Sequence, residues 1–117
     1  MRYIVGVDIG GTNIVVGTVR EDGGAIHGVH SVATRSEEGA QAVIARIAEL
    51  IEESIEETVA EAGVDRGEVV GVGIGSPGPL DRARGIVLLT PNLGWSLLPL
   101  RDLVSLSVQL PATLDND

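Results

Sequence analysis

A single long amphipathic helix set between short extended segments is the feature that most constrains how this chain can fold. Apolar side chains recur every three or four residues up to Ala62, and Gly63 is a typical helix stop. We expect this helix to begin at Ser36 or Glu37. Its opposite face is acidic, and a charge run on an amphipathic helix is usually a solvated face. Strand-like segments before and after the helix indicate an α/β domain.

The extended segments predict a mixed sheet. Three β-rich segments precede the helix and are joined by glycine turns, which favours an antiparallel meander over residues 3–7, 13–20 and 27–33. After the helix, Val69 to Ile74 is almost uninterruptedly apolar, as in a strand covered on both faces, and the crossover helix favours parallel pairing. Downstream we expect an extended piece at 86–89, a loop at 91–95, a short helix or turn at 100–106 and a last strand at 110–114.

Composition narrows the class of protein. The 117 residues fit one domain, residues 1–117, and 44% of them are hydrophobic, enough to build a core. A net charge of -9 argues against a nucleic-acid or anionic-membrane surface. The absence of cysteine suits a reducing compartment, and no secretory leader or membrane-spanning run is evident. We therefore expect a cytoplasmic protein.

The turn between the first two extended segments carries the first candidate site, Asp8-Ile9-Gly10-Gly11-Thr12-Asn13. Adjacent glycines allow positive φ and leave no Cβ in the way, so a phosphate could approach the backbone N–H groups, with the Thr12 hydroxyl as a further donor. Asp8 beside a polyphosphate would need a cation between them, so we expect it to face hydrated Mg²⁺. Taken alone, this motif is equally typical of an ordinary hairpin turn.

Three further motifs follow in order: Gly73-Ile74-Gly75-Ser76-Pro77-Gly78, Pro91-Asn92-Leu93-Gly94-Trp95 and Leu114-Asp115-Asn116-Asp117. Each is weak alone, because Ser-Pro-Gly and Pro-Asn are common turn formers. Together with the first motif, they make the whole chain resemble the N-terminal domain of the ROK family, which comprises repressors, open-reading-frame kinases and bacterial glucokinases. The resemblance implies a ribonuclease H-like domain of the actin and hexokinase superfamily, with three antiparallel strands, then parallel strands and flanking helices.

The resemblance also implies roles for particular residues. The loop of Asp8, Gly10, Gly11, Thr12 and Asn13 would hold ATP, with Asp8 toward Mg²⁺. A sugar pocket would be formed by Gly75, Ser76, Pro77, Gly78, Asn92, Asn116 and Asp117. Asp117 would be the catalytic carboxylate that accepts the proton of the attacking sugar hydroxyl. Glucose and ATP are the family defaults; N-acetylmannosamine, fructose or allose remain open as sugars.

Family kinases continue into a second domain with further sugar contacts and a cysteine-rich zinc site, which these 117 residues lack. We therefore expect the polypeptide alone to have negligible kinase activity, with zinc only in that second domain. Two alternatives stay open: the sugar-sensing domain of a ROK regulator, and a non-catalytic module that self-associates through an uncovered apolar face.

Two residue types carry separate expectations. Trp95 could line the pocket mouth or serve as a packing anchor. His27 and His30 lie at odd spacing on one predicted strand, so we expect them to face opposite sides and not to share a metal.

Overall fold

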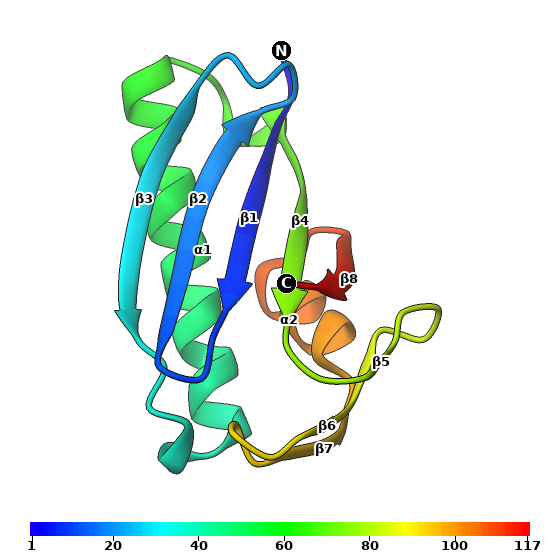
Figure 1. Ribbon diagram of the computed structural model, residues 1–117. Helices are drawn as coiled ribbons and strands as arrows, with labels where there is room; N and C mark the ends of the chain where they lie inside the picture. The colour runs from blue at the N-terminus through cyan, green and yellow to red at the C-terminus, as the bar shows by residue number, and fades with distance from the viewer.

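The computed structural model describes all 117 residues and contains a five-stranded mixed sheet, a small three-stranded sheet and two α-helices (Figure 1). The larger sheet has the strand order β3-β2-β1-β4-β8. Its strands are β1 (Tyr3–Ile9), β2 (Asn13–Arg20), β3 (Ile26–Ala33), β4 (Val69–Ser76) and β8 (Ala112–Asn116). The first three strands pair antiparallel, and β4 runs parallel to both β1 and β8. The predicted meander and parallel crossover are confirmed.

Both helices lie on one side of this sheet. In Figure 1, α1 (Ala40–Ala62) runs behind β1, β2 and β3, and α2 (Leu100–Val108) packs against α1 and β8. The predicted start of the long helix is wrong. Ser36–Glu38 forms a separate 3-10 turn, η1, because Gly39, with φ of 94°, interrupts the helical conformation before Ala40. A second 3-10 turn, η2 (Arg66–Glu68), precedes β4.

None of the helices has the length and apolar character needed to span a bilayer.

The face of the sheet away from the helices is open. Along β1 the buried side chains are Tyr3, Val5, Val7 and Ile9, and they alternate with exposed residues. In β4 the fully buried residues alternate, beyond Val69, with half-buried ones that include Gly71 and Gly73. The prediction that β4 is covered on both faces is therefore wrong: its run is apolar because one face is core and the other is rich in glycine.

The small sheet was only partly predicted. It consists of β5 (Leu80–Asp81), β6 (Ile86–Thr90) and β7 (Trp95–Leu98) in that order, all antiparallel. The sequence indicates β6, but it gives no sign of β5, and it treats Trp95 as part of a loop. Trp95 begins β7 and is only 3% exposed, within the hydrophobic core, so it is a packing anchor.

Candidate functional site

The candidate site lies where β1, β4 and β8 end at the same edge of the large sheet. Asp8 in β1 is level with Gly75 in β4, and Gly75 is level with Asp115 in β8. Asp117, just beyond β8, donates its main-chain N–H to the Ser76 carbonyl at 3.2 Å. A Cβ placed on Gly75 would lie 3.4 Å from the Cβ of Asp117. Asp8 and Asp117, from opposite ends of the chain, are thus neighbours around one glycine.

The turn between β1 and β2 forms the first predicted loop. Gly10 donates its N–H to the Asn13 carbonyl at 2.9 Å and closes the hairpin. Neither Gly10 nor Gly11 has a positive φ, so the expected left-handed conformation is not used. The missing side chain matters at Gly10, where a Cβ would lie only 3.1 Å from the Asn13 carbonyl oxygen, whereas a Cβ on Gly11 would make an ordinary contact with the Cβ of Asn92 at 3.7 Å. The N–H groups of Gly11 and Thr12 donate to no other group of the chain and are free for an anion.

Thr34, just after β3, anchors this loop. Its side chain is fully buried, its hydroxyl donates to the Gly10 carbonyl at 2.8 Å, and its main-chain N–H donates to the Thr12 carbonyl at 2.8 Å. Arg46 of α1 donates in turn to the Thr34 carbonyl at 2.6 Å and also pairs with Glu38. Thr34 therefore binds the carbonyls of Gly10 and Thr12, whereas the N–H groups of Gly11 and Thr12 stay free. Sequence reasoning missed Thr34 and Arg46, since neither belongs to a recognisable motif.

A pocket beside this loop is formed by the turn after β4 and the loop after β6. Pro77, Gly78 and Asn92, which were all predicted to bind a sugar, line this pocket of about 220 Å³ together with Thr90 and Pro91. Ser76 is fully buried, its hydroxyl donates to the Pro77 carbonyl at 3.1 Å, and it does not line this pocket. Thr90 was not predicted; it is 3% exposed, and its hydroxyl has no hydrogen-bond partner in the chain.

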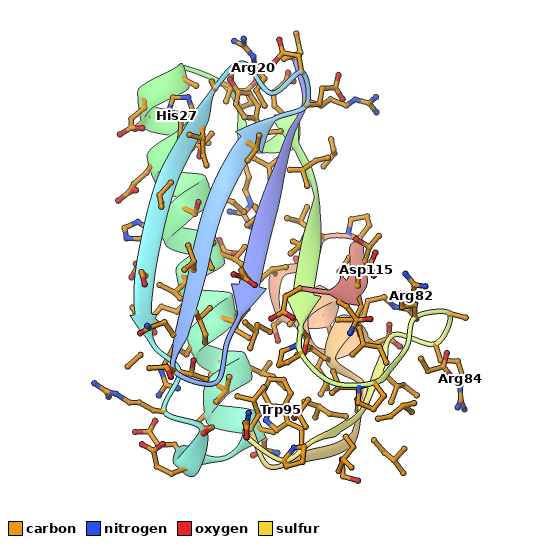
Figure 2. All side chains as sticks on the ribbon, in the orientation of Figure 1. Arg20, His27, Arg82, Arg84, Trp95 and Asp115 are labelled. Atoms are coloured by element: carbon orange, nitrogen blue, oxygen red, sulfur yellow. The ribbon has the colours of Figure 1, made fainter.

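The end of β8 is tied to the turn that follows β4. The side-chain amide of Asn116 donates from Nδ2 to the Gly78 carbonyl at 2.7 Å. Asp115 accepts, at Oδ1, the N–H of Asn116 at 2.8 Å and the guanidinium of Arg82 at 2.9 Å. The Asn116 N–H, followed by Arg82, holds the pKa of Asp115 below its ordinary value, so this carboxylate is ionised at neutral pH. Figure 2 shows Arg82 and Asp115 next to each other.

The side chains near the first loop are suited to a cation that is bound partly by a nucleotide, and less suited to an ion enclosed by protein ligands alone. No three His, Cys, Asp or Glu side chains are grouped so that they could enclose an ion. Asp8 offers a single exposed carboxylate beside the free N–H groups of the loop. In phosphoryl-transfer sites Mg²⁺ is commonly held by one or two carboxylates together with phosphate oxygens and water. The donor set therefore fits Mg²⁺ that arrives with a phosphate ligand.

Known proteins resemble this chain over nearly its whole length. Residues 4–117 match the family described as "ROK family". Glucokinase of Thermotoga maritima is 41% identical over 115 residues, which cover 97% of this chain and 33% of that protein. The solved ROK family glucokinase from Streptomyces griseus, in complex with glucose and AMPPNP, superposes with a TM-score of 0.81 at 37% identity, over 97% of this chain and 33% of that one. The predicted actin and hexokinase-type fold is confirmed.

Repressors also match. The xylose repressor of Caldicellulosiruptor bescii is 38% identical over 72 residues, 62% of this chain and 18% of that protein. The chain spans about a third of the length of the curated glucokinases it matches.

Proposed function

Because the chain belongs to the ROK family, we propose that it is the N-terminal domain of an ATP-dependent, glucokinase-like sugar kinase, which transfers the γ-phosphoryl group to a hexose hydroxyl. The observation that carries this proposal is the meeting of Asp8, the Gly10–Asn13 loop and Asp117 at one edge of the sheet. Support comes from the Streptomyces griseus glucokinase, whose structure holds both a sugar and a nucleotide analogue.

Asp117 is the proposed catalytic carboxylate. It follows a strand running parallel to β4, at the edge where open α/β sheets bind ligands. Phosphoryl transfer depends chiefly on positioning and charge stabilisation, so the carboxylate orients the sugar hydroxyl and takes its proton as the new bond forms. An ordinary exposed carboxylate is sufficient for this task.

The first loop is the proposed phosphate site. The free N–H groups of Gly11 and Thr12 donate to phosphate oxygens, and Asp8 holds the Mg²⁺ that accompanies ATP. Bound Mg²⁺ neutralises charge on the β- and γ-phosphates. Thr34 keeps the loop carbonyls turned away from these anions, because it hydrogen-bonds the carbonyls of Gly10 and Thr12.

The pocket of Pro77, Gly78 and Asn92 is the proposed sugar site. The amide of Asn116 is oriented by its bond to the Gly78 carbonyl, which leaves its Oδ1 free to accept a sugar hydroxyl. Hexose is proposed as the substrate class, with glucose as the first ligand to test.

Titration of the 117-residue chain, followed by nuclear magnetic resonance, tests the proposal. Glucose should shift the signals of residues 75–78, Asn92 and Asn116, and Mg²⁺ with AMPPNP should shift residues 8–13. Asp8→Asn should weaken nucleotide binding roughly tenfold through loss of the charged ligand. Asp65→Asn, which removes an exposed carboxylate next to η2 at the opposite end of β4, is the matched control. Absence of both sets of shifts would contradict the proposal.

A sugar-sensing role in a ROK regulator is the second candidate, favoured by the match to the xylose repressor. The same titration separates the two roles. Glucose shifts without any response to Mg²⁺ and AMPPNP support the sensor, whereas responses to both ligands support the kinase.

Negligible turnover by the 117 residues alone stays a prediction. Asp8, Asn92, Asn116 and Asp117 are all exposed, so bound substrates would remain open to water and poorly oriented for transfer. Robust glucose-dependent consumption of ATP by this polypeptide would contradict it.

A further inference from the structure

The hairpin of β5 and β6 reaches across the sheet edge to β8. Its turn carries Arg82, whose Nη1 donates to Oδ1 of Asp115 at 2.9 Å, 33 positions along the chain. Both side chains are about two-thirds exposed, at 64% and 67%. In Figure 2, Arg82 lies beside Asp115, while Arg84 of the same turn points away from β8. Arg84 pairs with Asp81 inside the hairpin, at 2.7 Å.

Asp115 links Arg82 to the next residue, Asn116. The same Oδ1 atom that receives Arg82 also accepts the main-chain N–H of Asn116 at 2.8 Å. The carboxylate therefore fixes the peptide that leads into Asn116 and Asp117. A carboxylate oxygen can accept several donors, so both bonds can form at the same atom.

A second link joins the same two segments closer to the root of the hairpin. The Asn116 amide donates to the Gly78 carbonyl at 2.7 Å. Gly78 itself lies close against β6: its φ is +100°, and an added Cβ would collide with the Leu89 carbonyl and the Thr90 side chain. The Asn116 side chain is therefore bound to the turn after β4. Its main-chain N–H is bound to Asp115, which in turn is bound to Arg82 of the hairpin.

We propose that Arg82 is a positioning residue, which acts through Asp115 to orient the amide of Asn116 at the sugar pocket. This inference rests on the proposed function, since it assigns Arg82 to the sugar site of that reaction. Arg82 is not one of the residues predicted to bind a ligand. Its effect is on the direction in which the amide oxygen of Asn116 is presented, and hence on affinity for the sugar.

If Arg82 were purely structural, its loss would lower the stability of the fold. An exposed ion pair contributes little to stability, so a positioning role predicts that Arg82→Gln leaves the urea midpoint close to that of the parent chain. Arg84→Gln is the matched control, because it removes the same charge from the same turn and breaks only the local pair with Asp81. Arg82→Lys keeps the charge and an N–H donor group but loses the planar guanidinium, so it should retain part of the function.

Two readouts test the inference. The chain has only three asparagines and two glutamines, so the side-chain amide signals of Asn116 can be resolved by magnetic resonance. In Arg82→Gln, hydrogen exchange of the Asn116 side-chain amide should accelerate and the affinity for glucose should fall. Each change should be about two- to fivefold, the factor expected for loss of an exposed ion pair. Arg84→Gln should change neither, and Arg82→Lys should lie between Arg82→Gln and the parent chain.

The outcomes separate this inference from the proposed function. Equal effects of Arg82→Gln and Arg84→Gln on the Asn116 amide would overturn the role of Arg82. So would an unchanged amide in Arg82→Gln. If the parent chain shows no glucose response, the sugar site assigned under the proposed function fails, while the exchange of the Asn116 side-chain amide still decides whether Arg82 positions that residue.

Discussion

At the scale of single residues, Gly28 decides where two histidines point. Their odd spacing predicts opposite directions, yet both face α1: His27 Nδ1 lies 2.9 Å from Oε1 of Glu61, and His30 Nε2 lies 2.9 Å from Oε2 of Glu57. The pairing register with β2 shifts between the two histidines, which marks a β-bulge, and Gly28 within it has φ of +61°. The prediction of opposite faces is therefore wrong.

Replacing Gly28 should test this bulge. A Cβ at this position would lie 2.6 Å from the carbonyl oxygen and the hydroxyl of Ser54 in α1, and φ is unfavourable for alanine. We expect Gly28→Ala to lower the free energy of unfolding by about 2–4 kcal/mol, measured by urea denaturation.

The control for this variant is Gly67→Ala, where an added Cβ meets nothing within 4 Å and φ is not left-handed. It should stay within about 0.5 kcal/mol of the parent chain. Equal stability of the two variants would contradict the close approach of β3 and α1.

At the scale of elements, periodicity predicted α1 well and the small sheet poorly. Twenty-three residues with a regular apolar stripe leave few alternatives to a helix, whereas β5 has two residues and β7 four, too few for a recognisable alternation. β7 also contains Leu97 at φ of 50°, a conformation that no strand pattern suggests. The helix start was misplaced because only the φ of Gly39 separates η1 from α1.

The attachment of α1 to the sheet includes a buried polar pair that periodicity did not indicate. Thr18 of β2 and Ser54 of α1 are fully buried, and their hydroxyls lie 2.7 Å apart. Ser54→Ala should cost about 1–3 kcal/mol of unfolding free energy because Thr18 is left without a partner. The double variant Thr18→Val, Ser54→Ala should lose less unfolding free energy than the two single variants lose together. A double-mutant cycle measured by urea denaturation tests this.

Ser107→Ala is the control for that cycle. This exposed serine donates to the Leu103 carbonyl of its own helix and should change stability by less than about 0.5 kcal/mol. Strictly additive effects of the Thr18 and Ser54 substitutions would show that the two hydroxyls are not coupled.

At the scale of the whole molecule, the candidate site was predictable as far as parallel strands bring their ends together. Asp8, Gly75 and Asp117 meet because β1, β4 and β8 are parallel neighbours. The supports of the site were not predictable, since Thr34 and Arg82 act through contacts between segments distant in sequence. Self-association through the open face of the sheet stays a prediction, for which the exposed Ile4, Val15 and Val29 are the relevant side chains.

The whole chain should lose stability in acid, partly through three paired carboxylates. Arg20 lowers the pKa of Asp22, Arg84 lowers that of Asp81, and the Asn116 N–H lowers that of Asp115, each from an ordinary value of 3.8. A carboxyl whose pKa falls on folding stabilises the fold above its unfolded pKa and loses that contribution as pH falls through the folded value. The loss should therefore begin below about pH 4.

Urea midpoints at about pH 6 and about pH 2.5 measure this loss, which is spread over three surface groups, with Asp22 and Asp115 exposed and Asp81 half-buried, and should be modest for each. In the triple variant Asp22→Asn, Asp81→Asn, Asp115→Asn, these carboxyls can no longer titrate, so the midpoint should fall less between the two pH values than in the parent chain. Both proteins become net positive in acid, the parent chain below its pI of about 4.5, and the triple variant begins with three fewer negative charges. An equal fall in both would mean that net charge, and not these hydrogen-bonded carboxylates, governs unfolding in acid.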